Sequence, residues 1–246
     1  MGATLYVIPG SHPCECVEAA LKLKGVDYKR VDLVPAIHAA VVRVSGFPGR
    51  TVPAIKVNGE KVQGSRKILR KLDELAPEPR LVPEDPALRA KVEEAEAWGD
   101  DVFQPLARRV AWGGFIRDRP SMLTYSAEGN LHMPAPFLKL GSAPVSKIAQ
   151  RINGASDEQV EADLAALPGY LDKIDAWIAE GVLGGETPNV ADLQIGSSIR
   201  ILTTFGDIKP LIAGRPAEKL ATNGFAPAVG AIPAGTYPPA WLAQTR

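Results

Sequence analysis

The strongest constraint on the fold is a change in the spacing of apolar residues at a proline-rich stretch, residues 76–83. Before this stretch short strand-like runs alternate with helical patterns, and after it long helical patterns dominate. A length of 246 residues suits one large domain or two modest ones. Because proline-rich segments are typical of linkers, we predict two domains, residues 1–78 and residues 86–246.

The first domain is predicted to begin with a strand, a helix and a second strand. Residues 4–8 form a β-branched and aromatic run that Pro9-Gly10 stops. Small and apolar positions then recur at helical spacing over residues 13–25, which end in a glycine typical of helix C-termini. Residues 28–33 alternate as a strand does. We therefore expect two strands joined by a right-handed crossover.

A hairpin and a second helix complete the first domain. Residues 52–57 are predicted to form a third strand, and the Asn58-Gly59 pair at its end is the strongest short signal for a hairpin. Residues 60–62 would return as a strand, and a helix would follow with Ser65 as its N-cap. This order of elements is that of a thioredoxin-like α/β domain.

The second domain is predicted to be all helical. Residues 88–110, 164–178 and 193–202 keep a helical spacing of apolar residues, the first as one long amphipathic helix. Residues 113–155 are rich in Gly, Pro and Ser and give only weak helical patterns. The proline-rich tail, residues 223–246, also contains aromatic residues, which favour an irregular segment docked on the domain over a disordered one.

Composition disfavours several classes of protein. Lys+Arg and Asp+Glu both number 28, so nothing global attracts the chain to nucleic acid or to an anionic membrane. No run of 18 apolar residues could span a bilayer. Cys14 and Cys16 are too close for an ordinary disulfide and too few for a zinc site. With no secretory signal visible, a reducing, cytoplasmic setting is expected.

Ser11 lies in a turn that ends the first strand and opens the first helix, residues 9–14. Backbone N–H groups and the positive end of the dipole at a helix start stabilise an anion. If that anion is a thiolate, a hydrogen bond from the Ser11 hydroxyl would lower its pKa. The alternative is that Ser11 is only the N-cap of this helix.

Cys14 follows Ser11 by three residues, the spacing of a redox C-x-x-C motif whose first cysteine has become serine. A dithiol cycle needs both sulfurs, so we interpret Cys14 as a small buried apolar residue and keep a reactive thiol as the alternative. His12 is interpreted as an exposed turn residue. His38 and His132 show no metal-ligand spacing, so no metal site is predicted.

Two further features suit a peptide-like ligand. Val52-Pro53 opens a strand, and a cis bond there would present the N–H and C=O of Val52 to an extended peptide. A trans proline in an edge strand is the alternative. The start of the second helix, Gly64-Ser65-Arg66, suits a carboxylate, although a bare N-cap would look identical.

Several of these motifs together resemble a known family. Residues 5–14, Arg50-Thr51-Val52-Pro53 and Ser65-Arg66 are similar to the N-terminal domain of cytosolic glutathione S-transferases, in particular the serine-using delta, theta and related bacterial groups. Residues 187–193 resemble the family's C-terminal capping segment, with Asn189 at the N-cap. The resemblance implies a thioredoxin-like domain followed by an all-helical domain, glutathione as co-substrate, and a homodimer.

The resemblance also implies roles for the site residues. Ser11 would hold and activate the glutathione thiolate, and a cis Pro53 would let the Val52 backbone pair with the cysteinyl part. The γ-glutamyl carboxylate would be bound by Ser65, with Arg50 and Arg66 as supporting cations.

Gly64 departs from the family, which usually has Glu or Gln there to bind the α-amino group of glutathione. Gln63, another residue or the second subunit would have to replace it, or the chain would bind a different low-molecular-weight thiol.

The implied activity is detoxifying attack of the bound thiolate on an electrophilic carbon of an apolar co-substrate. The co-substrate would lie between Ser11 and the helical domain, where Phe103, Trp112 and Phe115 are candidate walls, although core packing would explain each of them. Two alternatives stay open. One is a Cys14-dependent enzyme that reduces disulfides or removes glutathione from them, and the other is a non-catalytic thiol-binding protein on the same scaffold.

Overall fold

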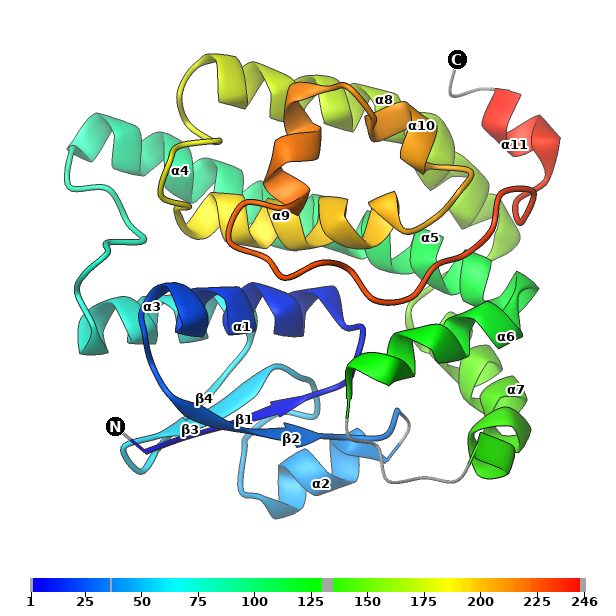
Figure 1. Cartoon of the computed structure of the whole chain (residues 1–246), viewed down its shortest axis with the longest axis horizontal. Coiled ribbons are helices and arrows are strands. Elements are labelled where there is room, and N and C mark those ends of the chain that lie inside the picture. The colour runs from blue at the N-terminus through cyan, green and yellow to red at the C-terminus, as the bar shows by residue number, and fades with distance from the viewer. Residues whose placement is uncertain (1, 36, 130–134, 244–246) are drawn as a thin grey trace.

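The structure, a computed structural model, describes the chain apart from residues 1, 36, 130–134 and 244–246. Its N-terminal part is a four-stranded sheet with helices on both faces (Figure 1). The elements of this part are β1 (Ala3–Val7), α1 (His12–Leu23), β2 (Tyr28–Asp32), α2 (His38–Val44), β3 (Ala54–Val57), β4 (Glu60–Gln63) and α3 (Ser65–Leu75).

The sheet has the strand order β2-β1-β3-β4. β1 and β2 are parallel because α1 crosses between them, whereas β3 is antiparallel to both of its neighbours. Asn58 and Gly59 adopt positive φ angles of 48° and 88° and close the turn between β3 and β4. The predicted hairpin and the predicted thioredoxin-like order are therefore confirmed.

Two apolar clusters hold helices to the sheet. α1 and α3 cover one face, where Leu5, Val17 and Ile68 are fully buried (Figure 1). α2 covers the other face, where Val42 and Phe47 are buried. The sequence carries no clear signal for α2, because its seven residues start without a side-chain cap and include β-branched valines.

The rest of the chain is helical, as predicted. Its elements are α4 (Pro86–Trp98), a π-helical turn (Gly99–Phe103), α5 (Gln104–Arg117), α6 (Arg119–Met122), a 3-10 helix (Leu123–Glu128), α7 (Ala135–Ile152), α8 (Asp157–Ala179), α9 (Val190–Thr203), α10 (Lys209–Ile212), a second 3-10 helix (Pro216–Ala221) and α11 (Pro239–Ala243). α8 and α9 confirm the helices predicted around residues 164–178 and 193–202. No described helix is both long and apolar enough to cross a membrane.

The helical extent predicted over residues 88–110 is confirmed, but this stretch is not one regular α-helix. The structure has two helices, α4 and α5, joined by the π-helical turn Gly99–Phe103. Pro105 lies in the first turn of α5 and has no backbone N–H, so it cannot continue the hydrogen-bond ladder of an unbroken helix. The π-helical turn shifts the helix by one residue, which changes the spacing of its apolar residues only slightly. The sequence pattern therefore does not reveal the turn.

The helical domain packs on α1 through α9, which lies directly above α1 in Figure 1. Arg200 of α9 forms an ion pair with Glu15 of α1, and the Cys16 thiol donates to the Gln194 side chain over 3.6 Å. This contact brings the start of α1 beneath the helical domain.

The tail docks on the helical domain over its described residues, as predicted. Tyr237 is buried, and its hydroxyl donates to the carbonyl oxygen of Val110 over 2.7 Å. The Asp207 carboxylate accepts hydrogen bonds from the backbone N–H groups of residues 235–237. These bonds explain how a segment with little regular structure remains in place.

Candidate functional site

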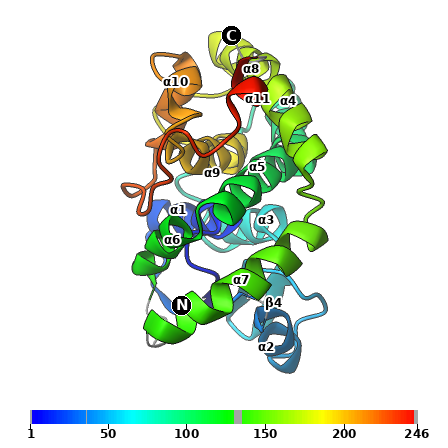
Figure 2. The ribbon, with the colours of Figure 1, turned by 90° about the vertical axis from the view of Figure 1, so that its right-hand side faces the viewer.

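A cleft of about 1240 Å³ opens between the sheet domain and the helical domain. One wall comes from the turn after β1, the loop before β3 and the start of α3, and the other from α5, α6 and α7. Figures 1 and 2 show α6 and α7 beyond the end of β1, where α1 begins. Every residue predicted for the site lines this cleft: Ser11, Arg50, Val52, Pro53, Gly64, Ser65 and Arg66.

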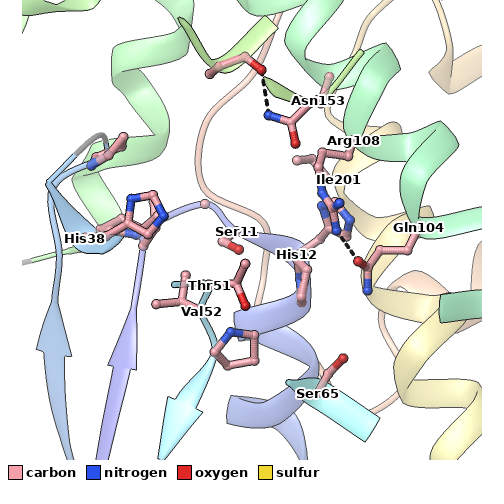
Figure 3. A pocket seen from close by; sticks show the side chains of 18 of the residues that line it. Ser11, His12, His38, Thr51, Val52, Ser65, Gln104, Arg108, Asn153 and Ile201 are labelled. Atoms are coloured by element: carbon pink, nitrogen blue, oxygen red, sulfur yellow. Dashed lines mark hydrogen bonds between the residues drawn. The ribbon is translucent and has the colours of Figure 1, made fainter. Parts of the chain in front are cut away.

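Ser11 occupies the N-cap position of α1 in an extended conformation, but its hydroxyl makes no capping hydrogen bond. Its backbone carbonyl accepts from the N–H groups of Cys14 and Glu15 at 2.8 Å and 3.1 Å. The helix therefore begins without using the hydroxyl, which lies at the cleft wall (Figure 3). A capping hydrogen bond therefore does not explain why residue 11 is a serine.

Cys14 lies behind Ser11 and is 1% exposed. Burial raises the pKa of its thiol to about 12, although a hydrogen bond with the Ser11 side chain lowers it. A thiol with this pKa is protonated near neutral pH and is a poor nucleophile. The interpretation of Cys14 as a small buried residue is confirmed, and the structure gives no support to a reactive Cys14.

The Val52–Pro53 peptide bond is cis, as one of the two alternatives predicted. Val52 and Pro53 both line the cleft. No residue that the structure describes hydrogen-bonds the backbone N–H or C=O of Val52. A strand-like ligand could therefore pair with this backbone from the cleft.

Gln63 fixes the loop before β3 by its side chain. Its Oε1 atom accepts from the Gly49 N–H over 2.7 Å, and its Nε2 atom donates to the Thr51 carbonyl over 2.6 Å. Both ends of the amide are thus engaged within the chain. Gln63 is therefore held in place by the loop, and its Oε1 atom accepts one of the two hydrogen bonds that an amide oxygen can accept.

Gly64, not Ser65, is the N-cap of α3, so the predicted N-cap was wrong by one residue. Gly64 has a φ of 92°, which favours glycine, whereas Ser65 is the first helical residue. The first N–H groups of α3 have no partner within the helix and face the cleft at Ser65. The positive φ angle therefore explains why this chain has glycine at residue 64, where the family usually has Glu or Gln.

Comparison with known proteins agrees with this geometry. Residues 5–80 match the family model "Glutathione S-transferase, N-terminal domain". The N-terminal domain belongs to the glutathione S-transferase superfamily. The chain is 32% identical over 115 residues to a probable maleylacetoacetate isomerase 1 of Drosophila melanogaster, covering 42% of this chain and 46% of the relative. It is 39% identical over 80 residues to the maleylacetoacetate isomerase of Rattus norvegicus, covering 31% and 37%. The chain thus spans less than half the length of these curated relatives.

The whole chain has the superfamily's fold. A glutathione S-transferase from Rhodospirillum rubrum F11 superposes with a TM-score of 0.60 at 21% identity over 99% of this chain and 100% of the other. Beta-etherase LigF from Sphingobium sp. strain SYK-6 superposes with a TM-score of 0.60 at 22% identity over 89% and 98%. The predicted fold class, a thioredoxin-like domain followed by an all-helical domain, is therefore confirmed.

The cleft of this glutathione S-transferase fold is positively charged, although the chain as a whole is neutral. Among the described lining residues the acidic ones are Glu96 and Asp100, whereas the basic ones are Arg50, Arg66, Lys67, Arg70 and Arg108. Glu96 is paired with Arg70 and lies 3.7 Å from Arg66. The cleft can therefore attract an anionic ligand locally.

His12 is not the exposed residue predicted. It is 3% exposed, and Gln104 and Arg108 of α5 lie close enough to act on its ring. Burial and then the positive charge of Arg108 lower the pKa of His12 to about 3, while a hydrogen bond with the Gln104 backbone raises it. Within the described part of the chain, its Nε2 atom has no hydrogen-bond partner.

Because burial keeps His12 neutral, we expect the folded chain to lose stability in mild acid. Its pKa is about 3 in the folded chain against 6.5 for the free side chain, so the unfolded state binds more protons between these values. The free energy of unfolding should fall by about 2 kcal/mol between pH 7 and pH 5 through this group. Urea denaturation at each pH measures the fall, which His12→Gln should reduce.

Proton NMR checks the same group directly. The chain has three histidines, so its ring signals are few. The His12 signal, assigned by its loss in His12→Gln, should not shift between pH 8 and pH 4.5. A midpoint near pH 6.5 for this signal would contradict the neutral, buried state.

The residues of the helical wall of the cleft differ in part from those predicted from the sequence. Phe103 is fully buried and stacks on Trp98 with ring centroids 5.4 Å apart, so it belongs to the core. Trp112 and Phe115 do line the cleft. Arg108 lines it too and was missed, although it stands one helical turn before Trp112 and so shares its face of α5.

Proposed function

We propose that the chain binds glutathione in the cleft and presents its thiolate to an electrophilic carbon of a second substrate. The observation that carries this proposal is the meeting of the Ser11 hydroxyl, the start of α1 and the unbonded Val52 backbone in one cleft. The Val52 backbone would pair with the cysteinyl unit. The Ser11 hydroxyl would then donate to the sulfur and stabilise its charged form.

The γ-glutamyl carboxylate would lie at the start of α3. The free N–H groups of that helix and its dipole favour an anion there, and Ser65 is at the first helical position. Arg66 lines the same part of the cleft, and Arg50 lies exposed in the adjoining loop. These two cations would strengthen the attraction without being fully neutralised by protein carboxylates.

Asp100 would bind the α-amino group in place of the residue absent at position 64. It lines the cleft, and Gln104 and Gln194 both donate to its Oδ1 atom at 3.1 Å. Its Oδ2 atom accepts no hydrogen bond from the residues that the structure describes, and Glu96 is already held by Arg70. An ammonium group at Asp100 would complete the recognition of glutathione by this chain.

The second substrate would lie against the helical wall near Trp112 and Phe115. Thiolate attack forms a carbon–sulfur bond, and the electron pair departs with a leaving group or enters a conjugated double bond. A second candidate function is isomerisation, which the names of the curated relatives favour. There the same addition would allow rotation about the resulting single bond, and elimination would return the thiolate, so that glutathione is not consumed.

The test begins with isothermal titration of the purified chain with glutathione, which should show binding at millimolar concentrations or below. S-methylglutathione, which lacks the thiol, is the matched ligand, and its affinity should not rise with pH as that of glutathione does. Absence of glutathione binding at millimolar concentration would contradict the proposal. Cysteine and γ-glutamylcysteine titrated in parallel would then identify a different thiol.

Turnover separates the two reactions. Loss of free thiol in the presence of 1-chloro-2,4-dinitrobenzene indicates transfer, whereas conversion of a cis double bond with constant thiol indicates isomerisation. The family resemblance further implies a homodimer and a cytoplasmic role in detoxification. Both stay predictions, and the first is measured by light scattering.

A further inference from the structure

The direction of the Ser11 side chain depends on the turn that joins β1 to α1. A hydrogen bond from the Ser11 N–H to the Ile8 carbonyl closes this turn over 3.1 Å. Pro9 is followed by Gly10 with a φ of 73°, an order that is typical of a type II turn. Because Gly10 directly precedes Ser11, a shift of the Gly10 backbone would move the hydroxyl that faces the cleft.

Tyr125, in the 3-10 helix Leu123–Glu128, packs directly against this turn. A Cβ atom at residue 10 would lie 2.9 Å from the Cβ atom of Tyr125 and 3.3 Å from Cδ1 of its ring. The Gly10 backbone therefore touches Tyr125, and no side chain would fit between them. Tyr125 is 6% exposed and lines the same cleft as Ser11. The place of Gly10 thus depends on the place of Tyr125.

Contacts within the helical domain hold both ends of the Tyr125 side chain. Its hydroxyl lies 2.5 Å from Oγ1 of Thr204, at the end of α9. The Thr204 hydroxyl gives its one proton to the Ile201 carbonyl, so Tyr125 is the donor. The Tyr125 ring meets the Phe115 ring edge to face, with centroids 5.0 Å apart. Tyr125 is therefore fixed to α9 and α5.

The C-terminal tail also packs against the Tyr125 ring. A Cβ atom at Gly230 would lie 2.7–2.9 Å from three atoms of this ring. The Ala231 N–H donates to Oγ1 of Thr124 over 3.2 Å, and the next residue, Ile232, is 2% exposed. Figure 1 shows the tail crossing the molecule below α9. The tail thus helps to hold a residue that touches the turn before Ser11.

We propose that Tyr125 is a positioning residue for Ser11. It connects the end of α9 and the tail to the turn at Gly10, and so keeps the Ser11 hydroxyl directed at the bound thiol. Reacting groups have to be held within about 0.5 Å of their productive geometry by the residues packed around them. This inference rests on the proposed function, in which Ser11 stabilises the thiolate.

The test measures the pKa of the bound glutathione thiol from the ultraviolet absorbance of the thiolate. Tyr125→Ala should raise this pKa by about one unit and lower kcat for conjugation near neutral pH by about tenfold, with little change in the KM for glutathione. Tyr125→Phe keeps the ring against Gly10 and loses the bond to Thr204, so its shift should be smaller. A raised KM with an unchanged thiol pKa would overturn the inference.

A double-mutant cycle shows whether Tyr125 acts through Ser11. In the Ser11→Ala background, Tyr125→Ala should leave the pKa of the bound thiol unchanged, because the hydroxyl that it positions is absent. A shift of equal size in both backgrounds would overturn the inference.

Tyr237→Phe is the matched control for Tyr125→Phe. Tyr237 is also buried and its hydroxyl also donates a hydrogen bond, but Tyr237 does not line the cleft. Its loss of one hydrogen bond should lower the free energy of unfolding without changing the thiol pKa. A thiol pKa shift as large as that of Tyr125→Phe would contradict a specific role of Tyr125.

Hydrogen exchange separates this inference from the proposed function. Without glutathione, the segment 8–14, which includes the bonded Ser11 N–H, should exchange about tenfold faster in Tyr125→Ala than in the wild type. Tyr237→Phe should leave this exchange unchanged. If the wild type binds no glutathione but the difference is found, the proposed function fails and Tyr125 still positions Ser11. Equal exchange in Tyr125→Ala and the wild type would overturn the inference whether or not glutathione binds.

Discussion

Ser11→Ala should lower kcat/KM for conjugation of 1-chloro-2,4-dinitrobenzene with glutathione by roughly 10- to 100-fold near neutral pH. A hydrogen bond to a charged group contributes about 1.5–3 kcal/mol, and here it would stabilise only the thiolate. Removing it should raise the pKa of the bound thiol by about one to two units. The loss should therefore be largest at low pH and should shrink as the pH rises and glutathione ionises unaided.

The matched control is Cys14→Ala. The thiol of Cys14 is buried and protonated, so its removal should leave most of the conjugation rate. A large loss in Cys14→Ala with no loss in Ser11→Ala would reverse the assignment and support the disulfide-reducing alternative. Unchanged turnover in Ser11→Ala at every pH would remove this serine from the mechanism.

The turn at Ser11 and the start of a strand at Pro53 could be predicted because their signals are local, whereas the sequence left the cis and trans forms of the Val52-Pro53 bond open. A strand that ends at Pro9-Gly10 and a helix that opens at Pro13 place Ser11 at a helix start, whatever the rest of the chain does. The Val52-Pro53 pair likewise marks the start of a strand. These signals need no knowledge of tertiary contacts.

The burial of His12 could not be predicted, because it depends on packing against residues far away in the sequence. Burial of this residue requires α5, about a hundred residues later, to cover the start of α1. The same contact makes Arg108 part of the site. A helical period shows which residues of α5 share a face, but it does not show what that face meets.

Gly64 illustrates how a departure from a family can have a physical reason. Its φ of 92° is unfavourable for any residue with a Cβ atom, so glycine relieves the start of α3 of strain. The neighbouring Gln63 is used to hold the loop that carries Arg50 and Thr51. Under the proposed function, the α-amino group of glutathione would therefore be bound by Asp100, which lines the same cleft.

Asp192→Ala should lower the free energy of unfolding by about 2–4 kcal/mol. Asp192 is 2% exposed, and its carboxylate accepts from the N–H groups of Gly184 and Asn189 at 2.7 Å and 2.9 Å. The Asn189 side chain accepts in return from the Asp192 N–H at 3.0 Å, which confirms the predicted capping box. The substitution leaves two N–H groups without partners, and each such loss costs about 1–3 kcal/mol when the group is buried.

The loss of stability should affect more than the start of α9, because α9 packs against α1, α4 and α5 and joins the two domains. Urea denaturation followed by circular dichroism measures it. Asp157→Ala is the matched control, since Asp157 also begins a helix but its side chain is 63% exposed and its ion pair with Arg117 lies at the surface. That control should cost less than about 1 kcal/mol. Equal losses for the two variants would mean that the buried start of α9 does not hold the domains together.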